Sequence, residues 1–287
     1  MYRTIVVGYR PDEHGEDAVA LARILADAPS TERVVVVEVV SGSRPLTKAL
    51  DRHAHGWPGG VEVGARVVET KAAADALRSI AEEERADVVV LGSTHRGRAG
   101  RVFAGTTASR FFHDAPCPVV IAPRGYRGDP APIRTVGVAF DASNEARAAL
   151  DWAAEVAGEL SAAIRLIGVV DAPPPAETWG ASVPGEAWAE GLSLAENMQL
   201  VDALRDRSRT DLERARASVG RSDAETLTVV GDPKNELREL AEQLDLLVVG
   251  THHEGLFGRV PVGSVSRGLA HVCPAPLAVV PRGAGPG

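Results

Sequence analysis

The chain has 287 residues, enough for two domains of ordinary size, and 45% of them are apolar, so each half can bury a core. Aromatic residues make up only 4%, so these cores consist of Val, Ala, Leu and Ile, a composition that fits parallel strands covered by helices on both faces. The net charge of −8 falls entirely on residues 131–287, and neither half is basic, which argues against general nucleic-acid binding.

Two further features of the sequence bear on where the protein works. No apolar run approaches the ~20 residues that a membrane span requires, and no charged-then-apolar leader precedes the first predicted strand. The two cysteines, Cys117 and Cys273, lack the spacing of a zinc site or of a disulfide framework. We therefore expect a cytoplasmic protein with no membrane partner and no structural metal.

The first half alternates aliphatic runs with amphipathic segments, which is typical of βαβ units and a parallel sheet. Strands are predicted at 3–9, 33–40, 61–68, 87–92 and 118–122. Helices are predicted at 14–28, 71–85 and 105–113, with a shorter one near 46–54. Turn-forming residues then interrupt the periodicity, and we place a linker between two domains at 127–133.

The second half follows the same order of elements. Strands are predicted at 134–140, 163–170, 225–230, 245–250 and 276–281, and helices at 144–160, 187–218, 233–243 and 263–271. On the longest helix the apolar residues recur every three to four positions: Leu194, Met198, Val201, Leu204, Leu212 and Ala215. We expect this apolar face to dock on the sheet. The Pro/Gly-rich loop before the helix contains Trp179 and Trp188. An alternative interpretation is that this loop forms a lid or a surface for a partner.

The two halves are copies of one domain, because they match over long segments at a constant offset. Residues 86–125 match residues 244–283 with an offset of 158, and residues 4–22 match residues 135–153 with an offset of 131. The second copy is therefore 27 residues longer between its first strand and its later motif.

The fold class predicted from this repeat is α/β, with two doubly wound five-stranded parallel-sheet domains in tandem. The domains span residues 1–126 and 134–287. Their last strands are aliphatic, and an unpaired aliphatic edge strand is prone to aggregation. We therefore expect strands 118–122 and 276–281 to pair with each other in antiparallel fashion about a pseudo-twofold axis.

Ligands of a doubly wound sheet bind beyond the carboxyl ends of the strands, where the strand order reverses. The first and fourth strands should flank that crevice in each domain. In the second domain Gly250 ends the fourth strand, and Gly263 and Ser264 stand where the next helix begins. Backbone N–H groups and the positive end of the helix dipole converge there, which predicts a phosphate cradle without the GxxxxGK[ST] sequence of a Walker loop.

A strand that ends in Gly, then two residues, Gly, nine residues and Gly-Ser/Thr, is the ATP-binding signature of the universal stress protein family, which this chain resembles in both halves. The resemblance implies five-stranded parallel sheets of the adenine-nucleotide α-hydrolase type, paired through their last strands within one chain. It also implies binding of ATP or a related adenine nucleotide, with or without Mg²⁺. Pairing of two such chains into a homodimer is kept as an alternative.

In the family that the chain resembles, an Asp after the first strand binds ribose, backbone at the end of the second strand holds adenine, and the glycine loop holds phosphates. The matching residues of the second domain are Ala139, Asp141, Val169, Val249, Gly250, His253, Gly263, Ser264 and Val265. The matching residues of the first domain are Gly8, Val39, Gly92, Gly105 and Thr106.

The sequence departs from the family pattern in two ways, of which the first is shared by both copies and the second occurs in the first copy alone. His95 and His253 replace the middle glycine, where a side chain either obstructs the phosphates or, when protonated, contacts them. Arg10 stands where the ribose-binding Asp is expected, and a cation cannot accept hydrogen bonds from ribose hydroxyls. We therefore expect the second domain to hold the better site. In the plainer alternative, Asp141 and Ser143 serve only as the N-cap of helix 144–160.

The leading hypothesis is a stress-response protein that binds an adenine nucleotide as a sensor or regulator. No paired general base and nucleophile stands out and the Walker lysine is missing, so no catalytic residue is assigned. No metal site is assigned either, because His252, His253 and Glu254 are consecutive and point in divergent directions. A nucleotide-free scaffold that acts by protein–protein contact and a slow ATP hydrolase stay as alternatives.

Overall fold

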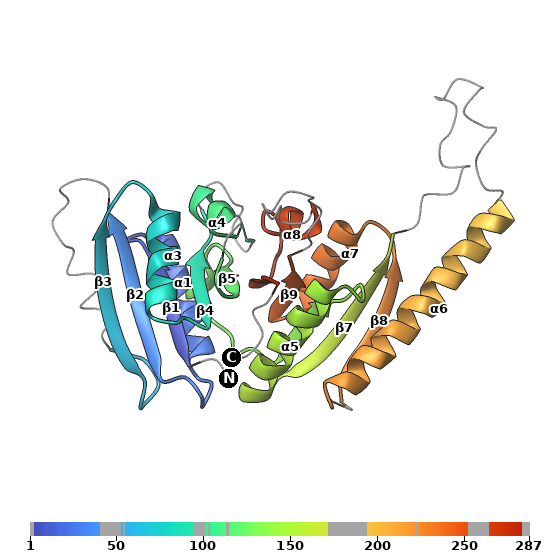
Figure 1. Cartoon of the computed structure of the whole chain (residues 1–287), viewed down its shortest axis with the longest axis horizontal. Coiled ribbons are helices and arrows are strands. Elements are labelled where there is room, and N and C mark those ends of the chain that lie inside the picture. The colour runs from blue at the N-terminus through green and yellow to red at the C-terminus, as the bar shows by residue number, and fades with distance from the viewer. Residues whose placement is uncertain are drawn as a thin grey trace, which may run out of the picture.

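A computed structural model describes residues 3–40, 53, 55–94, 101–102, 104–112, 115–171, 194–221, 223–251 and 264–282. These residues form one ten-stranded sheet with the order β3-β2-β1-β4-β5-β10-β9-β6-β7-β8 (Figure 1). The strands of the first half are β1 (Thr4–Tyr9), β2 (Arg33–Val40), β3 (Glu62–Glu69), β4 (Val88–Gly92) and β5 (Val119–Ala122). Those of the second half are β6 (Thr135–Ala139), β7 (Ala163–Val170), β8 (Glu225–Val230), β9 (Leu246–Gly250) and β10 (Leu277–Val280).

The helices connect parallel strands, as the alternating pattern predicts. In the first half they are α1 (Glu13–Leu25), α3 (Ala73–Glu83) and α4 (Thr106–Phe111). In the second half they are α5 (Asn144–Glu159), α6 (Leu194–Ser218), α7 (Pro233–Leu240), which continues into a 3₁₀ turn at Ala241–Gln243, and α8 (Ser264–Leu269). These bounds agree with the predicted ones to within a few residues. The predicted short helix near 46–54, the start of the helix at 187–218 and the loop with Trp179 and Trp188 lie largely or wholly outside the described residues.

The sheet buries both of its faces, and alternate residues of each strand contribute to opposite cores. On β1, Ile5 and Val7 belong to the core on the face covered by α1, α5 and α6, whereas Val6 belongs to the core on the face covered by α3, α4, α7 and α8. Both faces of a parallel sheet are covered in this way, which is why the strands are aliphatic throughout. The α/β class predicted from the composition is confirmed.

The two halves join at the centre of the sheet, where β5 and β10 are neighbours and run antiparallel. Every other neighbouring pair of strands is parallel. Val120 faces Ala278 across this junction, and both side chains are fully buried. The strand order is the same on each side, so the halves are related by an approximate twofold axis. The predicted antiparallel pairing of strands 118–122 and 276–281 is confirmed.

The connection between the halves is packed against α1. Asp17, which is fully buried, accepts hydrogen bonds from the backbone N–H of Gly125 at 2.7 Å and of Arg127 at 3.0 Å. The Arg127 guanidinium lies 3.2 Å from the same carboxylate. These donors offset the cost of burying the Asp17 charge, and they fix the path of the chain into the second half.

Helix α6 differs from its prediction. Leu212 and Ala215 are buried against β7 and β8, but Val201 and Leu204 are only half-buried and Met198 is 60% exposed, so the predicted apolar face docks fully only toward its C-terminal end. Length explains the difference: 25 helical residues extend about 37 Å, whereas the eight residues of β7 extend about 26 Å. The N-terminal end of α6 therefore reaches beyond the sheet (Figure 1).

Candidate functional site

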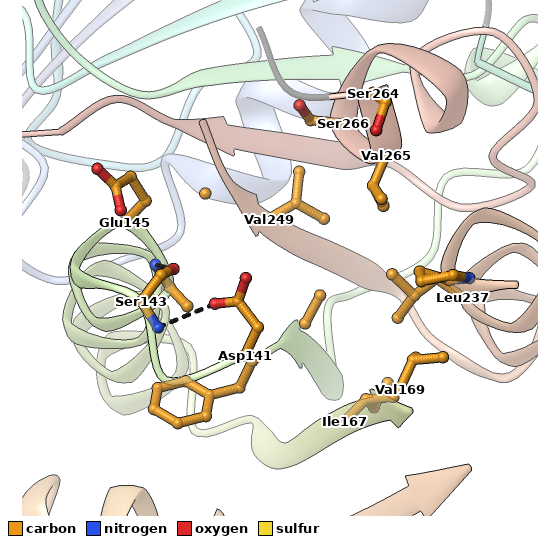
Figure 2. A pocket seen from close by; sticks show the side chains of 15 residues that line it. Asp141, Ser143, Glu145, Ile167, Val169, Leu237, Val249, Ser264, Val265 and Ser266 are labelled. Carbon is orange, nitrogen blue, oxygen red and sulfur yellow. Dashed lines mark hydrogen bonds between the residues drawn. The ribbon is translucent and has the colours of Figure 1, made fainter. Parts of the chain in front are cut away.

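A crevice opens in the second half at the carboxyl ends of β6 and β9, where the strand order reverses. It has a volume of about 230 Å³. The residues predicted for this site that line it are Ala139, Asp141, Val169, Val249, Gly250, Ser264 and Val265. His253 and Gly263 lie outside the described residues. Figure 2 shows Asp141 on one side of the crevice, Leu237 on another and Ser264 at the start of α8.

The start of α5 places Asp141 and Ser143 in different roles. Ser143 is the N-cap, because its Oγ accepts a hydrogen bond from the backbone N–H of Ala146 at 3.1 Å. Asp141 Oδ1 accepts one from the backbone N–H of Ser143 at 3.0 Å (Figure 2). Within the described part of the chain no other donor reaches this exposed carboxylate. Asp141 therefore keeps acceptor capacity toward the crevice that the cap does not use.

Gly250 is required by the packing of a helix, whether or not a ligand also approaches it. A Cβ at this position would lie 2.6 Å from the backbone oxygen of Glu145, in the first turn of α5. In the first half, a Cβ on Gly92 would collide with the backbone oxygen of His14, in the first turn of α1. Each glycine thus lets the first turn of a helix pack on the end of a strand, and this contact shapes the crevice wall.

The remaining walls of the second crevice are apolar at one end and hydroxylic at the other. Ile167 and Val169 come from β7, and Leu237 comes from α7. On the opposite side Ser264 and Ser266 line the crevice at the start of α8 (Figure 2). A flat apolar group fits the first wall, and a group that accepts hydrogen bonds fits the second.

A second crevice, of about 170 Å³, lies at the equivalent place in the first half, at the ends of β1 and β4. The residues predicted for this site all line it: Gly8, Val39, Gly92, Gly105 and Thr106. Arg10 and His14 line it as well. The structure thus brings together the described residues that the sequence assigned to each domain, in two separate crevices.

In the first half the capping residue is Asp12, which accepts hydrogen bonds from the backbone N–H groups of His14 at 3.0 Å and Gly15 at 3.2 Å. Arg10 donates to the same carboxylate through Nε, at 2.7 Å, and through Nη2. Burial by itself raises the pKa of Asp12, but the hydrogen bonds from Arg10 and the backbone outweigh it and hold the pKa below its ordinary value. The cap is therefore ionised, and it fixes the guanidinium at the mouth of the crevice.

The model of the universal stress protein family matches residues 45–123 and 132–281, which is most of the chain. The chain belongs to the universal stress protein family. The part of the first domain that precedes the match contains Arg10 and His14, two of the residues in which the crevices differ.

The relatives confirm a tandem family member. A universal stress protein of Mycobacterium tuberculosis (strain ATCC 25618 / H37Rv) is 27% identical over an alignment of 305 positions, which covers 97% of this chain and 99% of the relative. The crystal structure of a universal stress protein from Archaeoglobus fulgidus matches with a TM-score of 0.64 at 16% identity, over 98% of both chains. A functionally unknown protein from Pseudomonas aeruginosa PAO1 matches with a TM-score of 0.70 at 15% identity, over 98% of this chain and 93% of that one. The structural matches show that the whole chain has this family's fold.

Sequence reasoning missed Glu145 and His14, which line their crevices from the first helical turn. The signal was available, because the offset of 131 that relates Asp141 to Arg10 also relates Glu145 to His14. It also missed Leu237, because the contribution of α7 to the crevice depends on tertiary packing.

In the part of this universal stress protein that the structure describes, we find no reactive cysteine, no metal-ligand cluster and no membrane-spanning helix. Burial raises the pKa of both Cys117 and Cys273 to about 12, so neither thiol is a ready nucleophile at neutral pH. The described residues contain no cluster of metal ligands. None of the described helices is both long enough and apolar enough to cross a membrane.

Proposed function

We propose that this universal stress protein binds ATP or another adenine nucleotide in the second-domain crevice, and that it acts as a sensor or regulator rather than as a catalyst. The observation that carries the proposal is the carboxylate of Asp141, which faces the crevice and keeps acceptor capacity that the helix cap does not use. A ribose offers two adjacent hydroxyl donors, and a carboxylate is a suitable acceptor for both.

The rest of the crevice supports the same ligand. The apolar wall of Ile167, Val169 and Leu237 suits an adenine ring, and the hydroxyl of Ser264 can donate to a phosphate oxygen. Backbone at the ends of β7 and β9 would hold the base, and Asp141 would orient the sugar between base and phosphates. A phosphate-bound Mg²⁺ is compatible with this arrangement, because Mg²⁺ is commonly held by substrate phosphates and water.

The test is calorimetric titration of the full chain with ATP, AMP and cyclic AMP. We expect one dominant site, and we expect Ser264→Glu to weaken it at least about tenfold, because the new carboxylate repels phosphate. An acidic residue in the first helical turn interacts favourably with the positive end of the helix dipole, so the variant should keep its fold. The matched control is Thr106→Glu, which makes the same change at the equivalent position of the first domain and should leave the dominant site intact.

Two results would count against the proposal. Failure of the full chain to bind any of these nucleotides would favour a scaffold that acts by protein–protein contact. Steady release of phosphate from ATP, lost in Ser264→Glu and kept in Thr106→Glu, would make the second crevice a hydrolase site instead.

A further inference from the structure

The two crevices of this chain differ in the charge type of their lining side chains at equivalent positions. Among the described residues, the acidic or basic side chains that line the second crevice are Asp141 and Glu145, and those that line the first are Arg10 and His14. Arg10 corresponds to Asp141 and His14 to Glu145 in the alignment of the two domains. Two carboxylates are thus replaced by a guanidinium and an imidazole, neither of which carries negative charge.

Hydrogen bonds to Asp12, the N-cap residue of α1, hold the Arg10 side chain in place. Its Nε and Nη2 both donate to Asp12 Oδ2, and Asp12 is fixed by the backbone of His14 and Gly15. A guanidinium has five N–H donors in a planar fork, so it can hold Asp12 and a phosphate oxygen together. The cap therefore presents a pre-oriented cation at the place where the second domain presents an acceptor.

Glu13, the acidic residue next to His14, does not give the first crevice the negative charge that the second crevice has. His14 is buried, and its Nε2 lies 3.6 Å from Glu13 Oε1. The Glu13 carboxylate also lies 3.4 Å from the Arg124 guanidinium and 3.5 Å from that of Arg127. Glu13 thus faces three basic side chains, and it does not line the crevice.

Side chains of these two kinds suit different forms of ribose: one with free hydroxyls and one that carries a phosphate. A free ribose donates hydrogen bonds from its hydroxyls, and a guanidinium has no acceptor for them, whereas a phosphate on the ribose accepts from a guanidinium in a bidentate manner. The same exchange of acid for Arg separates dinucleotide sites that take a free 2′-hydroxyl from those that take a 2′-phosphate. We propose that the first-domain crevice binds an adenine nucleotide with a phosphate on its ribose, while the second-domain crevice takes one with a free diol.

This inference rests on the proposed function, and its test uses isomeric probes. ADP and adenosine 3′,5′-bisphosphate contain the same atoms, but the first carries both phosphates on the 5′ position and keeps its diol. The 2′,5′-bisphosphate is the third isomer. Each is titrated calorimetrically into the full chain with Ser264→Glu, which weakens the second crevice, and into Thr106→Glu, which weakens the first.

In the Ser264→Glu chain we expect one bisphosphate isomer to bind at least about tenfold tighter than ADP, because a charge-assisted contact to Arg10 is gained. Adding Arg10→Asp should reverse that preference. In the Thr106→Glu chain ADP should be preferred. Thermal melts of each variant check that the fold is retained, and Arg10→Lys keeps the charge without the fork as a milder replacement.

The outcomes distinguish this inference from the proposed function. Equal or tighter binding of ADP in the Ser264→Glu chain, with ADP still bound by Thr106→Glu, would overturn the inference and leave the proposed function standing. Pyrophosphate competing as strongly as the bisphosphates would also overturn it, since the crevice would then sense anions without reading a nucleoside. Loss of all nucleotide binding in Thr106→Glu would sink the proposed function and this inference with it.

Discussion

At the residue scale, the start of α5 shows how one turn can serve both folding and binding. Ser143 satisfies the backbone N–H of Ala146, while Asp141 accepts from Ser143 and faces the crevice. In the first domain Asp12 carries the cap, and Arg10 is tied to it. The plainer alternative, in which Asp141 only caps the helix, assigns it work that Ser143 already does.

Replacing Asp141 with Ala should therefore weaken ATP binding more than it weakens the fold. Loss of a charge-assisted hydrogen bond to the ribose corresponds to roughly 1.5–3 kcal/mol, or about tenfold to a hundredfold in affinity. Calorimetric titration with ATP measures the affinity, and a thermal melt of the same variant measures the stability. Arg10→Ala is the matched control and should change ATP affinity little. Equal losses from both substitutions, or none from either, would refute the ranking of the two crevices.

His253 gives a second prediction at this scale, although it lies outside the described residues. If its imidazole contacts bound phosphates, the anion favours the protonated form, so ATP affinity should rise as pH falls from about 8 to 6, through the ordinary His pKa of ~6.5. Titrations across this range, with His253→Gly as reference, separate the imidazole from the phosphates' own protonation. A flatter profile in His253→Gly indicates contact, and tighter binding at every pH indicates obstruction. Identical curves would show that His253 points away from the crevice.

At the scale of the elements, α6 is divided between a docked part and an overhanging part. Leu212 is buried and lies against Gly168 of β7, where an added Cβ would come within 3.2 Å of the Leu212 side chain. Met198, about four turns closer to the N-terminus, is 60% exposed. The regular apolar spacing along the helix is the same in both parts, so periodicity alone cannot tell which one meets the sheet.

Leu212→Ala should lower the free energy of unfolding by about 2–5 kcal/mol, because it opens a cavity between α6 and the sheet. Met198→Ala should change it by less than about 0.5 kcal/mol, since the side chain is already exposed. Urea unfolding of the two variants and the parent measures both values. A large loss from Met198→Ala would mean that the overhanging part of α6 is covered in solution.

At the scale of the whole molecule, the paired strands β5 and β10 make one sheet out of two domains. The junction is supported by the loop before α4, where the backbone N–H of Val102 donates to the carbonyl of Cys273 at 2.7 Å and that of Ala104 to Ala270 at 2.6 Å. The two halves also meet where Ser30 N–H donates to Glu159 Oε2 at 3.1 Å. We therefore expect the halves to unfold together.

Val120→Asp places a charge in this junction without a partner and should destabilise the chain by about 3 kcal/mol or more. The freed aliphatic edges should then pair between chains, so light scattering should detect dimers or larger species. Val67→Asp makes the same change on half-buried β3, at the outer edge of the sheet, and should cost less and leave the chain monodisperse. A single monomeric species with two separate unfolding transitions in Val120→Asp would show that the domains do not depend on each other.

The sequence by itself determined the repeat, the class and order of the elements and the pairing of the last strands. These features depend on local patterns: aliphatic runs such as 33–40 predict buried strands, turn residues predict their ends, and an aliphatic edge needs a partner. The residues assigned to each domain's crevice also follow from pattern, because the carboxyl ends of adjacent parallel strands meet at one edge of the sheet. For His253 and Gly263 that assignment stays a prediction.

Only the tertiary structure decided which neighbours those residues have. Gly250 and Gly92 are glycines because a helical turn from a distant segment packs on them, and Asp17 is buried because the linker folds back onto it. Glu145 and His14 enter the two crevices through the same packing. Each of these contacts joins residues that are far apart in the chain, and its geometry is set by the lengths and packing of whole elements, which local periodicity does not encode.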